Sequence, residues 1–325
     1  MSAGIGEQVA VALCTRGRPR MLAAALASLA RLDPCGHQVR VIVVHNDKAL
    51  AAPPPLDPSL ASLPGFAPIQ FVEREIGIAQ ARNRALDEAM ALGCRWLAFI
   101  DDDETADPQW LAQLLATATR RGLALAGGPV RMHKPAADAT REERIVWAGI
   151  ARRFAANERR AAAKAARSAD GGITIITSNW LCDLDFVRRH GLRFDNSTAL
   201  SGGEDTEFYR SLVRLGGRSG WAPGAIVHEE WPRERLTLAY HRRRGRDQAA
   251  ARFARKFAER GVLALPEALA TAAARGGAAF FWELRSLLDG GASRVRAARS
   301  IGAAGGVIAA LRGERVAHYE KVTGG

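Results

Sequence analysis

The chain has 325 residues, a formal net charge of +12 and an isoelectric point near 10.5. This length can bury a sizeable core, and the charge predicts an anionic partner: nucleic acid, an acidic membrane surface or a phosphorylated substrate. The four cysteines are too scattered for a zinc site or a disulfide framework, which favours a reducing cytoplasm, and no apolar run is long enough to span a membrane.

Short apolar segments alternate with helical patterns over the first 130 residues. Strands are predicted at 9–15, 39–44, 69–73, 96–103 and 123–130, and helices at about 21–29, 77–89 and 108–121. This alternation predicts an α/β domain with a mostly parallel central sheet flanked by helices. The first strand is followed by neither a G-x-G-x-x-G turn nor a P-loop, which disfavours a dinucleotide-binding fold and a P-loop NTPase.

Three consecutive aspartates, Asp101, Asp102 and Asp103, follow the buried strand that begins at Trp96. Ligands of open α/β sheets bind beyond the carboxyl ends of such strands. Adjacent carboxylates repel one another and need solvation, hydrogen bonds or a cation. The stretch is therefore either a ligand or metal site, or a polar turn that precedes the next helix.

Two later segments also contain residues that could act in catalysis or bind a ligand. Glu204 and Asp205 follow two glycines at a predicted helix start, where they can cap the helix or serve as a base. A short predicted strand ends at His228, and a lone histidine is more often structural than a metal ligand. Arg82 lies near the start of the helix at 77–89, and its position alone predicts a solvated surface residue.

The remaining segments are less regular. Residues 136–169 are predicted to form an exposed helix or a mobile loop over the site, and residues 173–180 resume a β-like pattern. Dense positive charge at 241–246 and 252–260 predicts one or two cationic helices, whose charge is either a solvated face or a contact for acidic lipids. Residues 263–288 hold apolar clusters interrupted by charges, which suits lying on a membrane better than crossing one.

Six segments in this order resemble the inverting glycosyltransferases of family 2, in particular the bacterial polysaccharide branch that includes succinoglycan-type glucosyltransferases. They are Val-Ala-Leu-Cys-Thr-Arg-Gly-Arg-Pro at 11–19, Val-Ile-Val-Val-His-Asn-Asp at 41–47, Gly-Ile-Ala-Gln-Ala-Arg-Asn at 77–83, Phe-Ile-Asp-Asp-Asp-Glu at 99–104, Gly-Gly-Glu-Asp-Thr-Glu-Phe at 202–208 and Trp-Ala-Pro-Gly-Ala-Ile-Val-His at 221–228. The resemblance covers roughly residues 8–250 and implies the GT-A fold.

With this resemblance, a catalytic domain is expected at 1–240, with a nucleotide-binding half at about 1–130 and an acceptor half at about 131–240. A basic, amphipathic helical extension is expected at 241–325.

The resemblance also implies roles for individual residues. Asp205 matches the catalytic base and Glu204 its acidic neighbour. Asp101 and Asp102 are expected nearer the nucleotide. Asp103 is expected as the principal metal ligand, joined by Asp101, with His228 as a further metal or diphosphate contact. The other nucleotide-side contacts are expected from Thr15, Arg16, Asn46, Asp47, Arg82 and Asn83.

The implied activity is metal-dependent transfer of a sugar from a nucleotide-diphosphate donor to a hydroxyl of a glycan or lipid-linked acceptor. Carboxylate ligands suit Mg²⁺ or Mn²⁺. Many relatives end the second strand in Asp-Asp or Asp-Asn where this chain has His45-Asn46-Asp47, so UDP is favoured with one departure from the pattern.

Two other functions would account for parts of the sequence. A sugar nucleotidyltransferase would need a glycine-rich phosphate loop, but residues 14–18 supply one glycine. A basic protein that binds nucleic acid or membrane without catalysis would leave the aspartates unexplained, and nucleic acid is disfavoured because Tyr240 is the only aromatic residue beside 242–246. We expect a cytoplasmic enzyme, peripheral on the inner membrane through residues 241–290, and leave open whether it forms a homo-oligomer.

Overall fold

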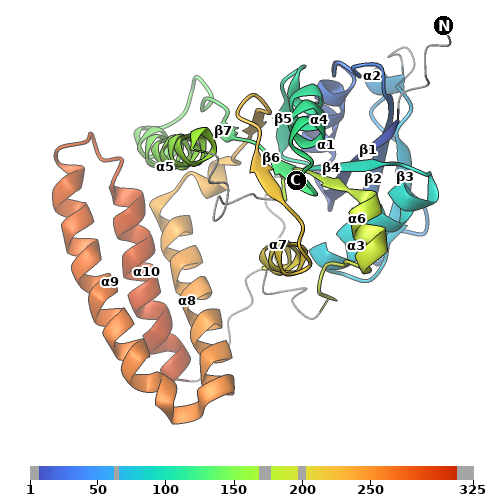
Figure 1. Ribbon diagram of the computed structural model, residues 1–325. Helices are drawn as coiled ribbons and strands as arrows, with labels where there is room; N and C mark the ends of the chain where they lie inside the picture. Colours follow the sequence, from blue (N-terminus) through green and yellow to red (C-terminus); the bar gives the residue numbers. More distant parts are fainter. Residues whose placement is uncertain (1–6, 62–65, 168–176, 197–202, 313–325) are drawn as a thin grey trace, which may run out of the picture. The chain divides into compact units, whose positions relative to one another are not determined.

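The computed structural model describes residues 7–61, 66–167, 177–196 and 203–312 (Figure 1). They form two compact units, the first containing residues up to 132 and 155–230, the second containing residues 133–154 and those from 231 onward. The helix α5 (Arg141–Ala166) contributes residues to both units. The expected domains at 1–240 and 241–325 stay a prediction, and the second unit takes in residues from both ranges.

The first unit is built on a seven-stranded sheet with the order β3-β2-β1-β4-β8-β6-β9. Its strands are β1 (Gln8–Thr15), β2 (Gln38–Asn46), β3 (Ile69–Glu73), β4 (Trp96–Ile100), β6 (Leu125–Gly127), β8 (Asn179–Asp183) and β9 (Ser219–Trp221). Strand β8 runs antiparallel to its neighbours β4 and β6, and every other pairing in this sheet is parallel. The predicted mostly parallel sheet is confirmed.

Alternating side chains of β1 enter two separate apolar cores, as expected for a strand covered on both faces. Val9, Val11 and Leu13 pack in the core that contains α1 (Pro19–Leu29) and α4 (Trp110–Arg121). Ala10 and Ala12 pack in the other core. That core contains residues of α3 (Ile78–Ala91), α6 (Leu184–His190) and α7 (Glu204–Arg214). The sheet is therefore the middle layer of an α/β/α arrangement.

A small second sheet lies at the edge that carries the acidic stretch. It has the order β5-β10-β7, from β5 (Glu104–Ala106), β10 (Val227–Glu229) and β7 (Val130–Met132). The segment 96–103, predicted as one strand, ends at Ile100 and turns into β5, and the predicted strand 123–130 is divided between β6 and β7. The turn between β4 and β5 places the aspartates outside the sheet.

The segment 136–169 contains the helix α5, which confirms the helical alternative for its described part. Of the β-like segment 173–180, residues 173–176 lie outside the described residues, and the strand β8 begins at Asn179. A further one-turn helix, α2 (Pro58–Ala61), precedes β3.

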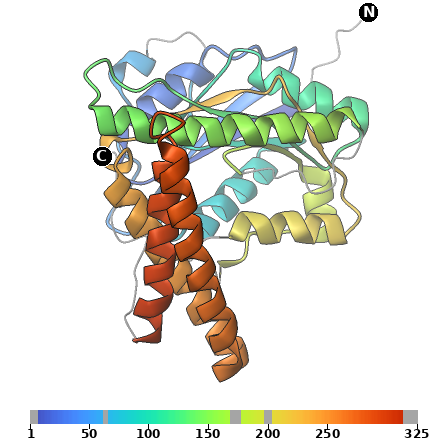
Figure 2. The ribbon, with the colours of Figure 1, turned by 90° about the vertical axis from the view of Figure 1, so that its left-hand side faces the viewer.

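The second unit consists mainly of helices, which confirms the predicted helical C-terminal region. Its elements are η2 (Arg233–Arg235), α8 (Leu238–Arg260), η3 (Gly261–Ala264), α9 (Leu265–Ser286) and α10 (Arg294–Leu311). Figures 1 and 2 both show α8, α9 and α10 side by side. Within the described chain, each helix is too short or too polar to cross a bilayer.

Glycines let α8 and α10 approach closely. A Cβ atom on Gly302 would lie 1.9 Å from the carbonyl oxygen of Arg242, and one on Gly245 would lie 2.3 Å from that of Arg299. Because both distances are far below van der Waals contact, a larger residue at either position would push the two helices apart.

Candidate functional site

The acidic turn after β4 is tied to the end of β1. Asp102 is buried; its Oδ2 accepts a 2.7 Å hydrogen bond from Thr15 Oγ1, and its Oδ1 accepts one of 2.8 Å from Arg18 Nη1. The same guanidinium nitrogen lies 3.2 Å from Asp103 Oδ2. The structure therefore brings together the ends of two adjacent parallel strands, β1 and β4.

Arg82 links this turn to the start of α7. Its guanidinium is buried, with Nη1 2.5 Å from Glu204 Oε1 and Nη2 3.7 Å from Asp101 Oδ1. The charge also lies 5.8 Å from the centre of the Phe194 ring. Arg82 is thus a buried bridge between Asp101 and Glu204, which are 103 positions apart in the chain, rather than a solvated surface residue.

Negative charge exceeds positive charge at this edge of the sheet. Although the side chain of Asp101 stays partly exposed, desolvation of its carboxylate raises its pKa to about 6, while Arg82 opposes the rise. Burial also raises the pKa of Glu104 well above its usual value, and Asp101 and Glu229 add to that effect. Arg18 and Arg82, two described cations, oppose these carboxylates, and an edge with this many acidic side chains favours binding of a further cation.

The donor atoms at this edge suit a hard divalent cation. Asp101 and Asp103 offer carboxylate oxygens, the ligands that Mg²⁺ and Mn²⁺ prefer. Among the described residues, no three histidine, cysteine or acidic side chains are grouped closely enough to hold a metal ion. A cation here would therefore complete its coordination with water or substrate phosphates, as Mg²⁺ commonly does.

His228 lies in β10, which pairs with β5 directly after the acidic turn. Its Nε2 is 3.2 Å from Asp107 Oδ1, and the register sets it opposite Thr105. The backbone oxygen of Asp103 accepts a 2.7 Å hydrogen bond from the amide of Glu230. The small sheet thus brings the chain around His228 to the acidic turn.

Asn46 and Asn83, two of the expected nucleotide contacts, are used inside the protein. Asn46 Nδ2 donates to the backbone oxygens of Glu73 (3.1 Å) and Glu75 (2.7 Å), and its Oδ1 accepts from the amide of Gly77 (2.9 Å). Both amide hydrogens are therefore occupied in shaping the turn before α3.

Asn83 makes a similar set of contacts. Its Nδ2 donates to Phe194 O at 2.9 Å and to Asn196 Oδ1 at 3.0 Å, and its Oδ1 accepts from Phe194 N at 2.9 Å. It fixes the chain that leads toward α7.

Two charged candidates on the nucleotide side keep exposed surface. Asp47 is half-buried, and its Oδ1 accepts a 2.9 Å hydrogen bond from the amide of Ala49, while no described residue bonds to its Oδ2. Arg16 is also half-buried and directly follows β1. Both positions are at the end of the sheet that carries the acidic turn.

The two acidic residues at the start of α7 have different surroundings. Glu204 is buried, and its Oε1 pairs with Arg82 while its Oε2 has no hydrogen-bond partner in the described chain. Asp205 is half-buried, and its Oδ1 accepts hydrogen bonds from the amide (2.6 Å) and hydroxyl (3.2 Å) of Thr206. Within the described chain the second oxygen of Asp205 accepts no hydrogen bond, so Asp205 is the better placed of the two to accept a proton.

Sequence reasoning missed Arg18 and Asn179. Arg18 joins two aspartates, but one of several arginines in a loop gives no signal of its own. Asn179 is fully buried and receives a 2.8 Å hydrogen bond from Trp110 Nε1. It donates to Pro129 O at 2.9 Å and Ala225 O at 2.8 Å, so it joins β8 to both connections that lead into the small sheet.

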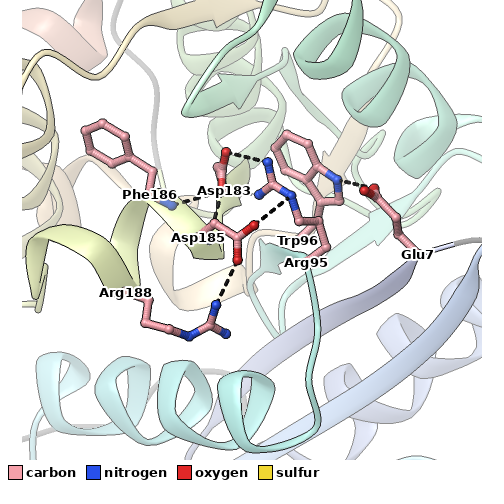
Figure 3. Close-up of polar contacts among 7 residues, drawn as sticks. All are labelled: Glu7, Arg95, Trp96, Asp183, Asp185, Phe186 and Arg188. Carbon is pink, nitrogen blue, oxygen red and sulfur yellow. Dashed lines mark hydrogen bonds and ion pairs between the residues drawn. The ribbon is translucent and has the colours of Figure 1, made fainter.

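A second polar cluster holds the opposite end of β4 (Figure 3). Arg95 pairs with both carboxylate oxygens of Asp183 and lies 3.2 Å from Asp185, while Trp96 Nε1 donates to Glu7 at 2.9 Å. Asp183 also caps α6 through the amides of Asp185 and Phe186. The charged groups of this cluster are paired with one another, which fits a structural role in joining β4 to β8.

Comparison with known proteins agrees with the resemblance drawn from the sequence. The model of the family "Glycosyl transferase family 2" matches residues 10–180. The chain is 33% identical over 242 residues to the succinoglycan biosynthesis protein ExoM of Rhizobium meliloti (strain 1021), which covers 71% of this chain and 69% of that protein. With the observed α/β sheet, these matches confirm a GT-A glycosyltransferase, an activity that implies a sugar-nucleotide donor and a glycan acceptor. The chain belongs to glycosyl transferase family 2.

Proposed function

We propose that the chain is an inverting, metal-dependent enzyme that transfers a sugar from a UDP-sugar to a hydroxyl of a glycan or lipid-linked acceptor. The observation that carries this proposal is the Arg82 bridge, which holds the acidic turn and the start of α7 together. A donor bound at the turn would lie beside the carboxylate of Asp205. The name of the relative supports a role in polysaccharide biosynthesis.

In the proposed reaction, Asp205 accepts the proton of the acceptor hydroxyl as its oxygen attacks the anomeric carbon. The bond from that carbon to the diphosphate oxygen breaks, and the electron pair leaves with the nucleoside diphosphate. Glu204 pairs with Arg82 and thereby holds α7 in place. A Mg²⁺ or Mn²⁺ ion held by Asp101 and Asp103, with His228 as a further contact to the ion or the diphosphate, would supply positive charge opposite the leaving group.

The nucleotide is assigned to the ends of β1 and β2. Thr15 orients Asp102, while Arg16 and Asp47 have exposed surface toward the same end of the sheet. We assign reading of the uracil ring to Asp47 rather than Asn46, because both amide hydrogens of Asn46 are already donated to the backbone.

Calorimetric titration tests the donor and the metal together. UDP and GDP are titrated into the full-length protein with Mn²⁺ and with EDTA, and again into the variant Asp103→Ala. The proposal expects UDP alone to bind, only with the metal, and binding to be lost in the variant. Tighter binding of GDP than of UDP would contradict the proposed UDP donor. Equal binding of UDP with Mn²⁺ and with EDTA would contradict the proposed metal dependence.

The base is tested by Asp205→Asn, which keeps the shape of the side chain and removes its basicity. Transfer should fall by about 10²- to 10⁴-fold while UDP binding stays unchanged, since general base catalysis contributes that much. Glu207→Gln is the matched control, because Glu207 lies on the same helix and pairs with Arg214. Full activity in Asp205→Asn would remove Asp205 from the mechanism.

We also propose that the second unit rests on the acidic cytoplasmic face of the inner membrane. Its exposed apolar side chains include Phe280 (69% exposed), Phe281 (54%) and Leu288 (88%), and α8 is rich in arginine. Apolar side chains among basic ones suit an anionic lipid surface.

Pelleting of the full-length protein with vesicles that contain anionic lipid tests this contact. The double variant Phe280→Ser/Phe281→Ser should pellet less than the natural protein. Equal pelleting of both would exclude α9 as the contact.

A further inference from the structure

A pocket of about 240 Å³ lies between α8, α9 and α10 in the second unit. Its walls are residues three or four positions apart, so that each helix presents one face to it. The residues that the argument uses are Phe253, Ala268 and Val307 on the apolar side and Arg252, Arg275 and Arg299 on the basic side. The pocket therefore combines an apolar wall with positive charge.

Positive charge in the pocket is only partly compensated. Glu267 is the one acidic residue among those that line it, and it pairs with Lys256 and lies 3.7 Å from Arg260. No described carboxylate forms an ion pair with Arg252, Arg275 or Arg299. An anion that entered the pocket would find three cationic side chains without a competing acidic partner.

Arg299 is the most informative of these residues. It is half-buried, and its Nε is shielded from solvent without a hydrogen-bond partner in the described chain. Desolvation and the nearby charges of Arg153 and Arg244 lower its pKa to about 10. The Nε of Arg244 is also buried without a partner, and its Nη1 donates to Tyr240 Oη at 3.0 Å. Partly desolvated cations that repel one another destabilise the unit unless an anion joins them.

The turn that joins α8 to α9 lies beside the pocket and exposes apolar side chains. Val262 is 69% exposed and Leu263 is 80% exposed in η3, and Leu269 on the first turns of α9 is 57% exposed. Ala264, the last residue of η3, lines the pocket itself. Exposed apolar side chains next to a basic pocket match the two parts of a phospholipid, its acyl chains and its charged head group.

We propose that this pocket binds the head-group phosphate of an anionic phospholipid, with Val262 and Leu263 of the α8–α9 turn among the acyl chains. The phosphate would accept hydrogen bonds from Arg299 and from Arg252 or Arg275, and the apolar wall would contact the first carbons of the chains. This proposal rests on the membrane contact proposed above and adds a site for a single lipid.

The test is titration of the full-length protein with dihexanoyl phosphatidylglycerol below its micelle concentration, followed by calorimetry. Dihexanoyl phosphatidylcholine and inorganic phosphate are titrated in parallel. The anionic lipid should bind, and Arg299→Gln should weaken its binding about tenfold, since a charge-assisted hydrogen bond contributes that much. Arg243→Gln, on α8 outside the pocket, is the matched control and should bind as the natural protein does.

Three results would overturn the proposal. Equal binding of phosphatidylcholine would show that the charge of the head group is not recognised. Equal binding of inorganic phosphate would make the pocket a site for the free anion. Unchanged binding in Arg299→Gln would remove the pocket from the interaction.

Two further measurements keep the test separate from folding and from catalysis. Arg299→Gln should melt at the same or a higher temperature than the natural protein, because it removes a half-buried charge that no described carboxylate compensates. Ala303→Leu fills the pocket without changing charge and should also weaken lipid binding. UDP binding should be unaffected by either variant, so a failure of the donor assignment is distinguishable from a failure here.

Discussion

Arg82 contacts two acidic segments, so its replacement tests the buried bridge directly. Arg82→Met leaves Glu204 buried without its partner, and we expect the free energy of unfolding to fall by roughly 3–5 kcal/mol. The double variant Arg82→Met/Glu204→Leu should regain most of that loss, because it buries no unpaired charge. Urea denaturation of the three proteins measures both effects.

Arg84→Met is the control for loss of an arginine from the same helix. Arg84 pairs with Glu88 on the partly exposed side of α3, so its loss should change stability by less than about 1 kcal/mol. If the double variant were as unstable as Arg82→Met, the loss would come from packing and not from the ion pair.

His241 gives the second unit a dependence on pH. It is fully buried and stacks on Trp231, and desolvation with the charges of Arg299, Arg244 and Arg153 lowers its pKa from 6.5 to about 3. In the unfolded chain this histidine takes up a proton near pH 6.5, whereas in the folded chain it stays neutral. Its contribution to stability is therefore complete above pH 6.5 and is lost as the pH falls toward 3.

We expect the natural protein to lose stability on acidification more steeply than His241→Gln, by at most about 1.4 kcal/mol per pH unit. Chemical denaturation at several pH values below neutrality measures the two slopes. His37→Gln, a partly exposed histidine of the first unit, should keep the slope of the natural protein. If the free energy of unfolding of His241→Gln and of the natural protein changed equally with pH, His241 would not be the source of the pH dependence.

The charged residues expected at the site stay predictions, and the structure shows contacts that sequence patterns do not reveal. The position of Asp101, Asp102 and Asp103 after a buried strand was enough to predict their place at the sheet edge. Asn46 occurs where relatives have a base-reading residue, yet its partners are backbone atoms of the turn before α3, which no spacing reveals. The Arg82 bridge depends on a contact between distant segments, so only the fold identifies it.

At the scale of elements, the contact between α8 and α10 makes two neighbouring glycines differ. A Cβ on Gly302 would overlap the backbone of α8, whereas one on Gly305 meets nothing within 4 Å. We expect Gly302→Ala to destabilise the second unit by about 1–3 kcal/mol. Gly305→Ala should stabilise it by up to about 1 kcal/mol, because alanine favours a helix over glycine.

Thermal unfolding followed by circular dichroism compares these two variants. The melting temperature should fall in Gly302→Ala and rise in Gly305→Ala. Destabilisation by both would mean that Gly305 is also in a close contact, while no effect of either would mean that α8 and α10 can separate without loss.

Strands buried on both faces were the elements best predicted from sequence. In β1 the apolar run is buried almost throughout, and the predicted limits of β1, β2 and β3 agree with the structure to within two residues, although β3 is a half-buried edge strand. The segment 96–103 was extended too far because aspartates directly after an apolar run give no sign of where pairing stops. The antiparallel direction of β8 was not predicted, since side-chain alternation is the same in both directions.

At the scale of the whole molecule, the charge of +12 predicts a strong effect of salt on membrane contact. We expect pelleting with anionic vesicles to fall sharply between about 0.05 M and about 0.5 M NaCl, as the screening length becomes shorter than the spacing of surface charges. UDP binding in the presence of Mn²⁺ should fall less, because Asp102 and Arg82 are buried.

Vesicle pelleting and calorimetry over the same salt series separate the two interactions. Pelleting that does not change with salt would show that apolar contact alone holds the protein on the membrane.

Sequence patterns could not predict which segments of the chain form the second unit. Residues 133–154 belong to it with the segment after 231, although they are nearly 80 residues apart. Gly149 shows why: a Cβ there would lie 2.3 Å from the backbone oxygen of Ala292, a contact set by tertiary packing. The sequence pattern within one segment does not show which distant segment it will contact.

The reversed direction of β8 has a consequence for the surroundings of the acidic turn. Because Asn179 is paired with Ile100, the chain enters β8 at the acidic edge, and Ser178 there bonds to Glu104. A change at Ser178 would therefore alter the surroundings of the acidic turn while the strands that hold the turn stay the same.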